Sequence, residues 1–201
     1  MLEIKNATKR YGFLTVLDNF SLKFPEKGVV AMLGPSGSGK TTLMRVIAGL
    51  EKLDAGELIK APGARVSMVF QEDRLIPVLS AKENILAALH PGKESEAKAE
   101  EMLLACGISQ AAHLLPRKLS GGMQRRVAIA RALAFGGDIL LLDEPFKGLD
   151  PQTREDVIRL VLDQRAGGLT LLVTHSMEEA QRCAGMILHF KGPPLTKFDH
   201  A

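Results

Sequence analysis

The feature that most constrains the fold of this chain is a glycine-rich run between an apolar segment and a helix-like segment. The run Gly-Pro-Ser-Gly-Ser-Gly-Lys-Thr-Thr occupies residues 34–42, after the apolar Val29–Leu33 and before Leu43–Leu50. In the spacing G-x-x-x-x-G-K-[ST], glycines let backbone N–H groups curl toward phosphate oxygens, and the helix start adds partial positive charge. The alternative is a Gly/Ser-rich turn that fits the pattern by chance. The flanking strand and helix favour a site for a nucleoside triphosphate.

Individual residues of this loop have separate predicted roles. Lys40 is expected to reach the β- and γ-phosphates, and the Thr41 hydroxyl is expected to ligate Mg²⁺. The residues expected to contact the nucleotide are Gly34, Pro35, Ser36, Gly37, Ser38, Gly39, Lys40, Thr41 and Thr42.

Composition and charge limit the classes of partner and the compartment that we expect for this chain. The 201 residues carry a formal net charge of +3, and the basic residues are scattered, so nucleic acid is not expected as a partner. The basic pair Arg125–Arg126 reads equally well as a solvated helix face. Cys106 and Cys183 lack metal-ligand spacing and are expected to be buried small apolar residues. No secretory signal core or bilayer-length apolar run is visible, so we expect a cytoplasmic protein whose membrane role would need another chain.

Apolar segments alternate with helical segments along most of the chain. Strands are expected at residues 2–5, 20–24, 29–33, 57–60, 66–70, 139–142, 169–174 and 186–190. Helices are expected at 121–134, from 150 to about 167, and from 177 onward. This alternation predicts an α/β fold with a mostly parallel sheet, which binds ligands beyond the carboxyl ends of its strands.

The middle third of the chain is helical instead. Ser80 to Glu83 has capping-box spacing and opens a helix expected to end near Leu89, and a second helix is expected over residues 95–106. We therefore expect one domain over residues 1–201 with a helical insertion at about 75–118. Residues 191–201 are expected to form an irregular C-terminal tail.

Two acidic residues follow a buried strand. Ile139–Leu142 is expected to deliver Asp143 toward Mg²⁺, and Glu144 is placed to polarise the attacking water as a general base. The alternative is a strand that ends in two solvated acids, which is less attractive beside a phosphate loop.

Two further polar residues follow other predicted strands. His175 comes after the strand that ends at Thr174, and it either contacts the γ-phosphate or has a structural role. Gln71 comes after Phe70, and it either touches Mg²⁺ and water or is an ordinary loop residue. Both are therefore candidates for the catalytic site.

A second glycine-rich helix start lies about eighty residues after the first. Ser120 is expected to cap a helix whose first turn contains Gly121 and Gly122, which leaves N–H groups exposed for an anion. This cradle has no lysine and no metal ligand, and a single phosphate chain does not need two cradles. Unless Ser120 is an ordinary helix cap, the economical inference is that it covers a nucleotide held by another subunit.

The order of these motifs resembles that of the ATPase subunit of ATP-binding cassette (ABC) transporters. The resemblance extends from Tyr11 to His175 and covers nearly the whole chain. The matching motifs are the Walker A at 34–42, the Q-loop at Gln71, the signature motif at 119–124, the Walker B at 139–145, the D-loop at 148–150 and the switch histidine His175.

The resemblance implies a P-loop NTPase fold, with a RecA-like mostly parallel sheet, an N-terminal antiparallel β subdomain and a small helical insertion. It implies ATP and Mg²⁺ as ligands, with Thr41, Gln71 and Asp143 around the metal. It also implies that Tyr11 stacks on adenine, that Asp150 of the D-loop joins the nucleotide site, and that Glu144 is the catalytic glutamate.

The resemblance implies partners as well. Two copies are expected to form a head-to-tail homodimer around ATP, and the segment Gln71–Leu79 is expected to receive integral-membrane permease subunits. The sequences Gln-Glu-Asp-Arg-Leu at 71–75 and Asp-Glu-Pro-Phe at 143–146 resemble bacterial importers of the nitrate, sulfonate and taurine type. A solute-binding protein in the same system and a peripheral location on the inner face of the cell membrane are therefore expected.

Two other functions are compatible with a phosphate loop. A non-transport ABC ATPase of DNA repair or translation would usually carry a long coiled-coil insertion or two cassettes, neither of which is visible. A small-molecule kinase would need an acceptor site and would have no use for the Ser120–Gly122 cradle.

Overall fold

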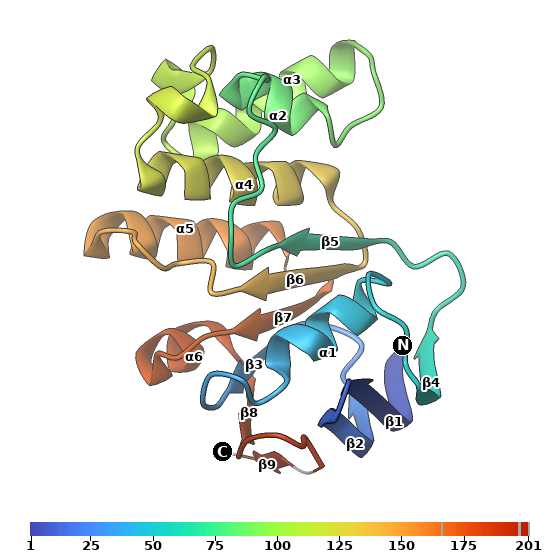
Figure 1. The fold of residues 1–201 in the computed structure, drawn as a ribbon. Helices are drawn as coiled ribbons and strands as arrows, with labels where there is room; N and C mark the ends of the chain where they lie inside the picture. The colour runs from blue at the N-terminus through green and yellow to red at the C-terminus, as the bar shows by residue number, and fades with distance from the viewer. Residues whose placement is uncertain (166, 197, 201) are drawn as a thin grey trace. The chain divides into compact units, whose positions relative to one another are not determined.

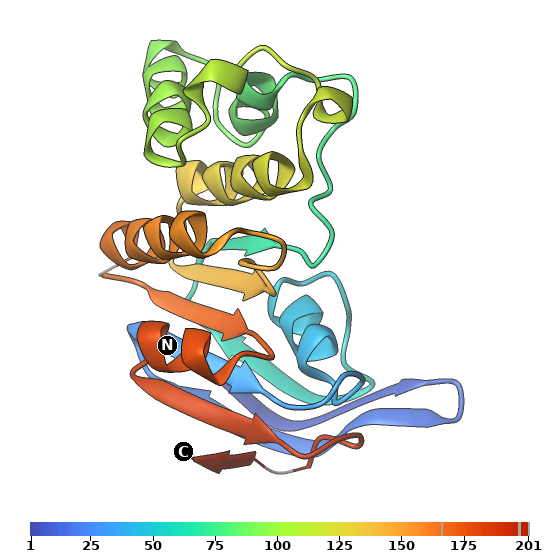
Figure 2. The ribbon, with the colours of Figure 1, turned by 90° about the vertical axis from the view of Figure 1, so that its left-hand side faces the viewer.

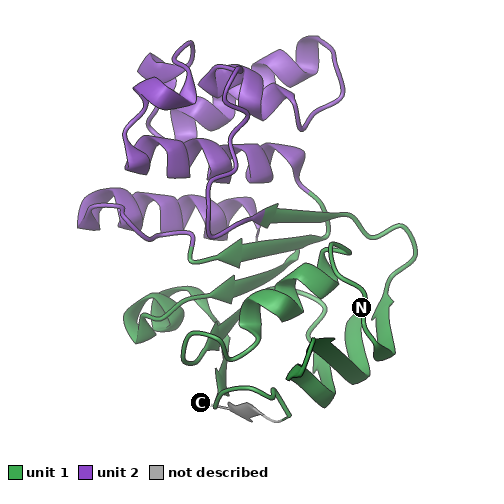
Figure 3. Cartoon of the chain, viewed as in Figure 1, with its two compact units in different colours: residues 1–68, 137–144, 166–201 green, residues 69–136, 145–165 purple. Residues whose placement is uncertain are grey.

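A computed structural model of the chain describes residues 1–165, 167–196 and 198–200, the last three by their backbone. The chain divides into two compact units (Figure 3). Unit 1 comprises residues 1–68, 137–144 and 166–201, and unit 2 comprises residues 69–136 and 145–165.

An antiparallel sheet in unit 1 has the strand order β2-β1-β4. Its strands are β1 (Leu2–Tyr11), β2 (Leu14–Phe24) and β4 (Ala55–Lys60). β1 and β2 are longer than the sequence pattern predicted and form the long hairpin visible in Figure 2. The pattern missed their outer parts because register shifts interrupt the period-two alternation and because many of these side chains are exposed and polar.

In the described part of the chain, the second sheet has the order β5-β6-β7-β3-β8-β9 (Figure 1). Its strands are β3 (Gly28–Leu33), β5 (Val66–Val69), β6 (Ile139–Asp143), β7 (Leu169–Val173), β8 (Met186–Phe190) and β9 (Phe198–His200). β3 pairs in parallel with β7 and β8, and β6 pairs in parallel with β7. Every residue of β6 and β7 is buried, as expected for central strands of a parallel sheet. The predicted fold class is confirmed.

Helices α1 (Lys40–Ile47) and α6 (Met177–Cys183) cover opposite faces of strand β3. Val30 and Met32 share a core cluster with residues of α1, whereas Ala31 and Leu33 pack against Ala180 of α6. The alternation follows from the strand, because successive side chains point to opposite faces. Cys183 of α6 is only half-buried, so the expectation of burial is wrong for this cysteine, while Cys106 is buried as expected.

Part of the expected irregular tail is ordered structure. β9 pairs antiparallel with β8, and the Leu195 N–H donates to the Val16 carbonyl at 2.8 Å. Leu195 itself is buried in the core of unit 1. The correction has a physical reason, since β9 occupies backbone groups that β8 would otherwise leave unpaired at the sheet edge.

Unit 2 contains α2 (Ala81–Leu86), α3 (Lys93–Ala105), α4 (Gly121–Phe135) and α5 (Pro151–Gln164), with short 3₁₀ turns at Ser109–Ala111 and Pro116–Lys118. The predicted capping box is confirmed, because Ser80 and Glu83 exchange side-chain to backbone hydrogen bonds. α2 ends three residues before the expected end. The compact unit includes α4 and α5, so it is larger than the predicted insertion at 75–118, which stays a prediction about domain boundaries. No helix in the described residues is both long and apolar enough to cross a bilayer.

Candidate nucleotide-binding site

The glycine-rich loop joins the end of β3 to the start of α1, as predicted. The Lys40 ammonium lies inside the loop and donates to the Gly34 and Pro35 carbonyls at 2.8 Å each, and to Ser38 Oγ at 3.0 Å. Burial lowers the pKa of Lys40, while the negative charges of Asp143 and Glu144 act in the opposite direction. The loop therefore holds a positive charge at the amino end of a helix, where phosphate oxygens bind.

Gly34 permits a close backbone approach in this loop. Its φ is +150°, and a Cβ at this position would clash with the Phe190 carbonyl oxygen and lie 3.2 Å from the Phe190 carbonyl carbon. Only glycine fits between the loop and β8 without displacing that strand. The close packing fixes where the loop begins.

Thr41 and Asp143 meet although they are 102 residues apart in sequence. Thr41 Oγ1 donates to Asp143 Oδ2 at 3.0 Å, and Asp143 is only 2% exposed. Burial raises the pKa of Asp143, while the Thr41 hydrogen bond and the Lys40 charge lower it. A hydroxyl and a carboxylate at this distance are oxygen ligands of the kind Mg²⁺ takes, so the residues fit the predicted metal.

Glu144 and His175 form the second pair. Glu144 Oε1 lies 3.1 Å from His175 Nε2. Glu144 has a φ of +49°, and its N–H donates to the Val173 carbonyl at 2.9 Å. A left-handed conformation is uncommon for glutamate and persists where surrounding contacts enforce it, often at functional sites.

These residues gather for a topological reason. Gly34, Glu144 and His175 each follow the carboxyl end of β3, β6 or β7, and the sheet order β6-β7-β3 makes these ends adjacent. Ligands of parallel sheets bind at this edge. Tyr11 lies at the end of β1, is 41% exposed, and has Lys9 Nζ at 5.2 Å from its ring centroid. Its stacking on adenine stays a prediction.

The remaining predicted site residues lie in unit 2. Ser120 caps α4 by accepting from the Met123 N–H at 3.3 Å, with Gly121 and Gly122 in the first turn. Asp150 caps α5 by accepting from the Thr153 N–H at 3.0 Å, a bond that lowers the pKa of Asp150.

The signature turn and the D-loop meet within this unit. A Cβ on Gly122 would lie 3.6 Å from Leu149 Cδ2 and 3.7 Å from the Gly148 carbonyl oxygen. The two motifs therefore pack closely against each other.

Sequence reasoning missed one residue near these motifs. Arg125, for which a solvated helix face was an equal reading, is only 6% exposed and donates to the Phe70 and Gln71 carbonyls at 2.7 and 2.5 Å. Its helical position was the available signal, because Arg125 falls on the same face of α4 as the buried Ala128 and Ile129.

The parallel sheet, the phosphate loop and the acidic strand end define a P-loop nucleoside triphosphatase. The family model described as ABC transporter matches residues 17–147. The chain belongs to this family and is an ATP-binding cassette ATPase.

Proteins similar in sequence to this chain carry names that agree with this family. The chain is 39% identical to the glutamine transport ATP-binding protein GlnQ of Escherichia coli (strain K12), over 94% of this chain and 86% of that protein. It is 40% identical to the aliphatic sulfonates import ATP-binding protein SsuB 2 of Pseudomonas syringae pv. syringae (strain B728a), over 93% and 68% of the two chains. It is also 40% identical to the taurine import ATP-binding protein TauB of Rhizobium johnstonii, over 99% and 84%.

Solved structures of similar fold are also ABC cassettes. The dimeric structure of MJ0796, a bacterial ABC transporter cassette, superimposes with a TM-score of 0.89 at 31% identity, covering 100% of this chain and 98% of that one. A dimeric post-hydrolysis state of MJ0796 bound to ADP and Pi gives a TM-score of 0.87 at 32% identity, with the same coverage. The sequence-based family assignment is confirmed.

Proposed function

We propose that this chain is the ATP-hydrolysing subunit of a bacterial importer, with Glu144 as general base. The observation that carries the proposal is the Glu144–His175 pair at 3.1 Å, next to the strand end that supplies Asp143. In this arrangement Glu144 accepts a proton from the water that attacks the γ-phosphorus, while the bond to the β-phosphate oxygen breaks and ADP leaves. His175 orients the Glu144 carboxylate. Gln71 would contact the same water.

Thr41, Asp143 and Gln71 would hold Mg²⁺, and Lys40 would bind the β- and γ-phosphates. The metal, when bound, supplies positive charge that neutralises the phosphates. The buried Asp143 carboxylate and its Thr41 contact support this assignment. Tyr11 would contact adenine, and the backbone of residues 34–42 would wrap the phosphates.

The nucleotide site is completed by a second copy. Ser120, Gly121, Gly122 and Asp150 would contact the ATP bound to the partner chain in a head-to-tail homodimer. The Ser120 cap supports this, because it begins α4 at a glycine-rich first turn, and helix starts favour anions. The two MJ0796 cassette structures are dimeric, which is consistent with it.

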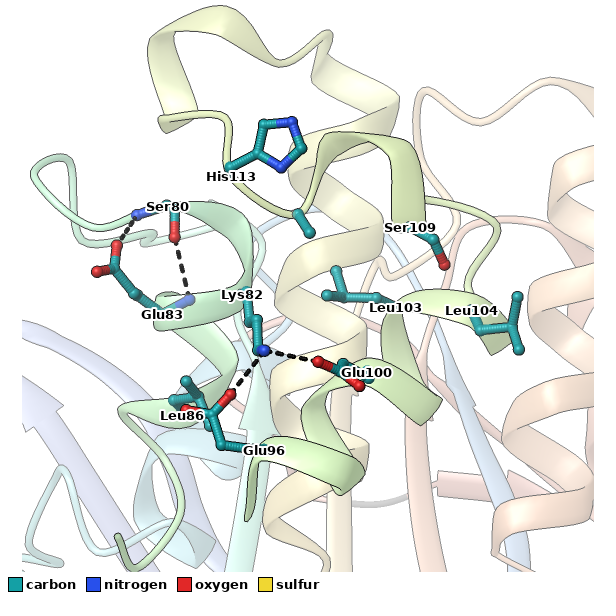
Figure 4. Close-up of a pocket in the computed structure, with 11 residues that line it drawn as sticks. Ser80, Lys82, Glu83, Leu86, Glu96, Glu100, Leu103, Leu104, Ser109 and His113 are labelled. Carbon is teal, nitrogen blue, oxygen red and sulfur yellow. Dashed lines mark hydrogen bonds and ion pairs between the residues drawn. The ribbon is translucent and has the colours of Figure 1, made fainter. Parts of the chain in front are cut away.

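A membrane permease would dock on the segment Gln71–Leu79. Ile76 and Val78 in this segment are 39% and 79% exposed, which suits apolar side chains that a partner covers. Ser80, the next residue, lines a pocket of about 720 Å³ within unit 2 (Figure 4). The pocket has apolar walls from Leu103 and Leu104 among others, and Lys82 forms ion pairs there with Glu96 and Glu100. The protein would thereby sit peripherally on the inner face of the cell membrane.

The importer assignment follows the relatives, whose designations name glutamine, aliphatic sulfonates and taurine at 39–40% identity. The sequence identities to these relatives are nearly equal although the relatives are named for different solutes. They therefore do not indicate which solute this chain's importer would carry. A solute-binding protein would deliver the cargo to the permease.

The test is ATP hydrolysis by the purified chain, followed by affinity capture from membranes of its source. Phosphate release that depends on Mg²⁺, together with co-purifying integral-membrane proteins, supports the proposal. Recovery of RNA or DNA without membrane proteins would instead support a non-transport ABC ATPase, and a phosphorylated small molecule would support a kinase.

A further inference from the structure

Two arginines of α4 bind the backbone of the segment that contains Gln71. Arg125 donates to the Phe70 carbonyl at 2.7 Å and to the Gln71 carbonyl at 2.5 Å. Arg131 donates to the Asp73 and Arg74 carbonyls at 3.0 Å each. Four carbonyl oxygens along five residues, 70–74, are therefore held by two side chains of one helix.

Charge and burial strengthen these contacts of Arg125 and Arg131 with residues 70–74, which we call the arginine clamp. Arg125 is 6% exposed, and its Nε lies 3.0 Å from Asp73 Oδ1. Charged donors give hydrogen bonds about twice as strong as neutral ones, and a buried guanidinium that loses its acceptors leaves an uncompensated charge. The clamp is thus a strong local constraint and not a surface contact.

The segment is fixed at its other end as well. The buried Asn84 side chain accepts from the Ile76 N–H at 2.7 Å and donates to the Leu79 and Ser80 carbonyls at 2.9 and 3.0 Å. Between these anchors Arg74 has a φ of +45°, and its guanidinium lies 4.2 Å from the Phe70 ring centroid. The proposed permease-docking segment is therefore pinned within unit 2 at both ends.

The same helix α4 begins at the signature turn. Arg125 follows the cap residue Ser120 by five positions, about 7.5 Å along a helix. The helix runs unbroken from Gly121 to Phe135, so it moves as a stiff element. A shift of the Gln71 backbone at the clamp would therefore shift the first turn of α4.

We propose that Arg125, aided by Arg131, is a positioning residue for ATP hydrolysis, which ties the Gln71 segment to the helix that presents Ser120. This inference rests on the proposed function, because the roles of Gln71 and Ser120 belong to it. Arg125 acts through Gln71 and α4 and does not touch the nucleotide.

The test compares variants of the whole chain for kcat and for affinity of a fluorescent ATP analogue. Arg125→Met keeps most of the side-chain volume but removes all donors, and Arg125→Lys retains one cationic donor. Arg159→Gln is the charge control, because Arg159 is an exposed arginine of α5 in the same unit, paired with Glu155. Thermal unfolding curves of each variant identify a temperature at which all of them are folded, and the assays are run at that temperature.

We expect Arg125→Met to lower kcat about tenfold or more, because a small misplacement of a catalytic group is costly. Analogue affinity should stay within about threefold of wild type, since the phosphate loop belongs to the other compact unit. Arg125→Lys should recover part of the lost kcat, and Arg159→Gln should match wild type.

An unchanged kcat in Arg125→Met overturns the inference. So does an equal loss of kcat and affinity, which would indicate a general structural role. If Arg125→Met does not fold, Arg125→Lys decides by the same criterion, with an intermediate kcat expected at unchanged affinity. A wild-type chain without ATPase activity would refute the proposed function itself, whereas an active wild type with an unaffected Arg125→Met refutes only this inference.

Discussion

Glu144 Oε1 lies 3.1 Å from His175 Nε2, at the ends of the adjacent parallel strands β6 and β7. The left-handed φ of Glu144, +49°, is stabilised by its N–H bond to Val173 at the end of β7. Strain of this kind costs about 1–3 kcal/mol and is retained where the surroundings over-determine it. The pair thus combines a glutamate whose backbone is held in a left-handed conformation with a histidine able to orient its carboxylate.

Replacing Glu144 tests its role as base. We expect Glu144→Gln to lower kcat about a hundredfold or more, because general-base catalysis contributes on that scale. ATP binding should persist, and the stalled chain should accumulate as an ATP-dependent dimer, seen by size-exclusion chromatography with light scattering. Steady-state hydrolysis near the wild-type rate would show that another group is the base.

Replacing His175 tests whether it acts through Glu144. His175→Ala should lower kcat about tenfold or more. Combined with Glu144→Gln it should add little, because residues that act as one unit are not additive. Measured kcat values of the two single variants and the double variant give the coupling. Independent, multiplying effects would mean that His175 does not work through Glu144.

Asp143 is expected to lower the stability of the nucleotide-free protein. Burial raises the pKa of Asp143, so between its ordinary pKa and the raised value the folded state binds more protons than the unfolded state. Stability therefore falls as pH rises through that window, and the ionised carboxylate is costly at neutral pH. Asp143→Asn should raise Tm by about 2 °C or more near pH 7, with the gain disappearing below about pH 4.

The same Asp143→Asn variant should lose Mg²⁺-dependent hydrolysis. Thermal melts across this pH range and phosphate-release assays at several Mg²⁺ concentrations check both effects. A lower Tm at neutral pH would show that the carboxylate stabilises the fold.

Gly34 should tolerate no side chain. Its φ of +150° and the clash of a Cβ with the Phe190 carbonyl oxygen should make Gly34→Ala destabilising by about 2 kcal/mol or more, with loss of ATP binding. Gly63 is the matched control, because its φ is +73° and nothing lies within 4 Å of its Cβ position. Gly63→Ala should cost only the backbone strain, about 1–2 kcal/mol. Urea unfolding measures both, and equal costs would rule out the steric explanation.

The two cysteines should differ in reactivity. Burial raises the pKa of Cys106 to about 12, against a smaller opposing effect of Arg126. Because the thiolate is the nucleophile, Cys106 should be inert to an aromatic disulfide reagent near pH 8 until the chain unfolds, whereas the half-buried Cys183 should react first. Cys183→Ser should abolish the fast phase. Fast labelling in that variant would mean that the Cys106 environment opens readily.

Local patterns sufficed for much of this fold. Central strands such as β6 and β7 are continuous apolar runs because both of their faces are buried, and Ser80, Ser120 and Asp150 cap helices through residues three positions away. The outer halves of β1 and β2 and the strand β9 escaped prediction, since backbone pairing with a neighbour stabilises them and leaves little trace in side-chain periodicity.

The α/β class, the phosphate loop and the ABC family follow from the amino-acid sequence alone, because they depend on residue types at fixed short spacings. Which distant residues meet depends instead on the tertiary structure. Thr41 reaches Asp143, and Glu144 reaches His175, because the order β6-β7-β3 brings separate strand ends together. The burial of Arg125 against the Gln71 backbone also depends on tertiary structure, because its partners are carbonyl oxygens, which every residue carries and no sequence pattern marks.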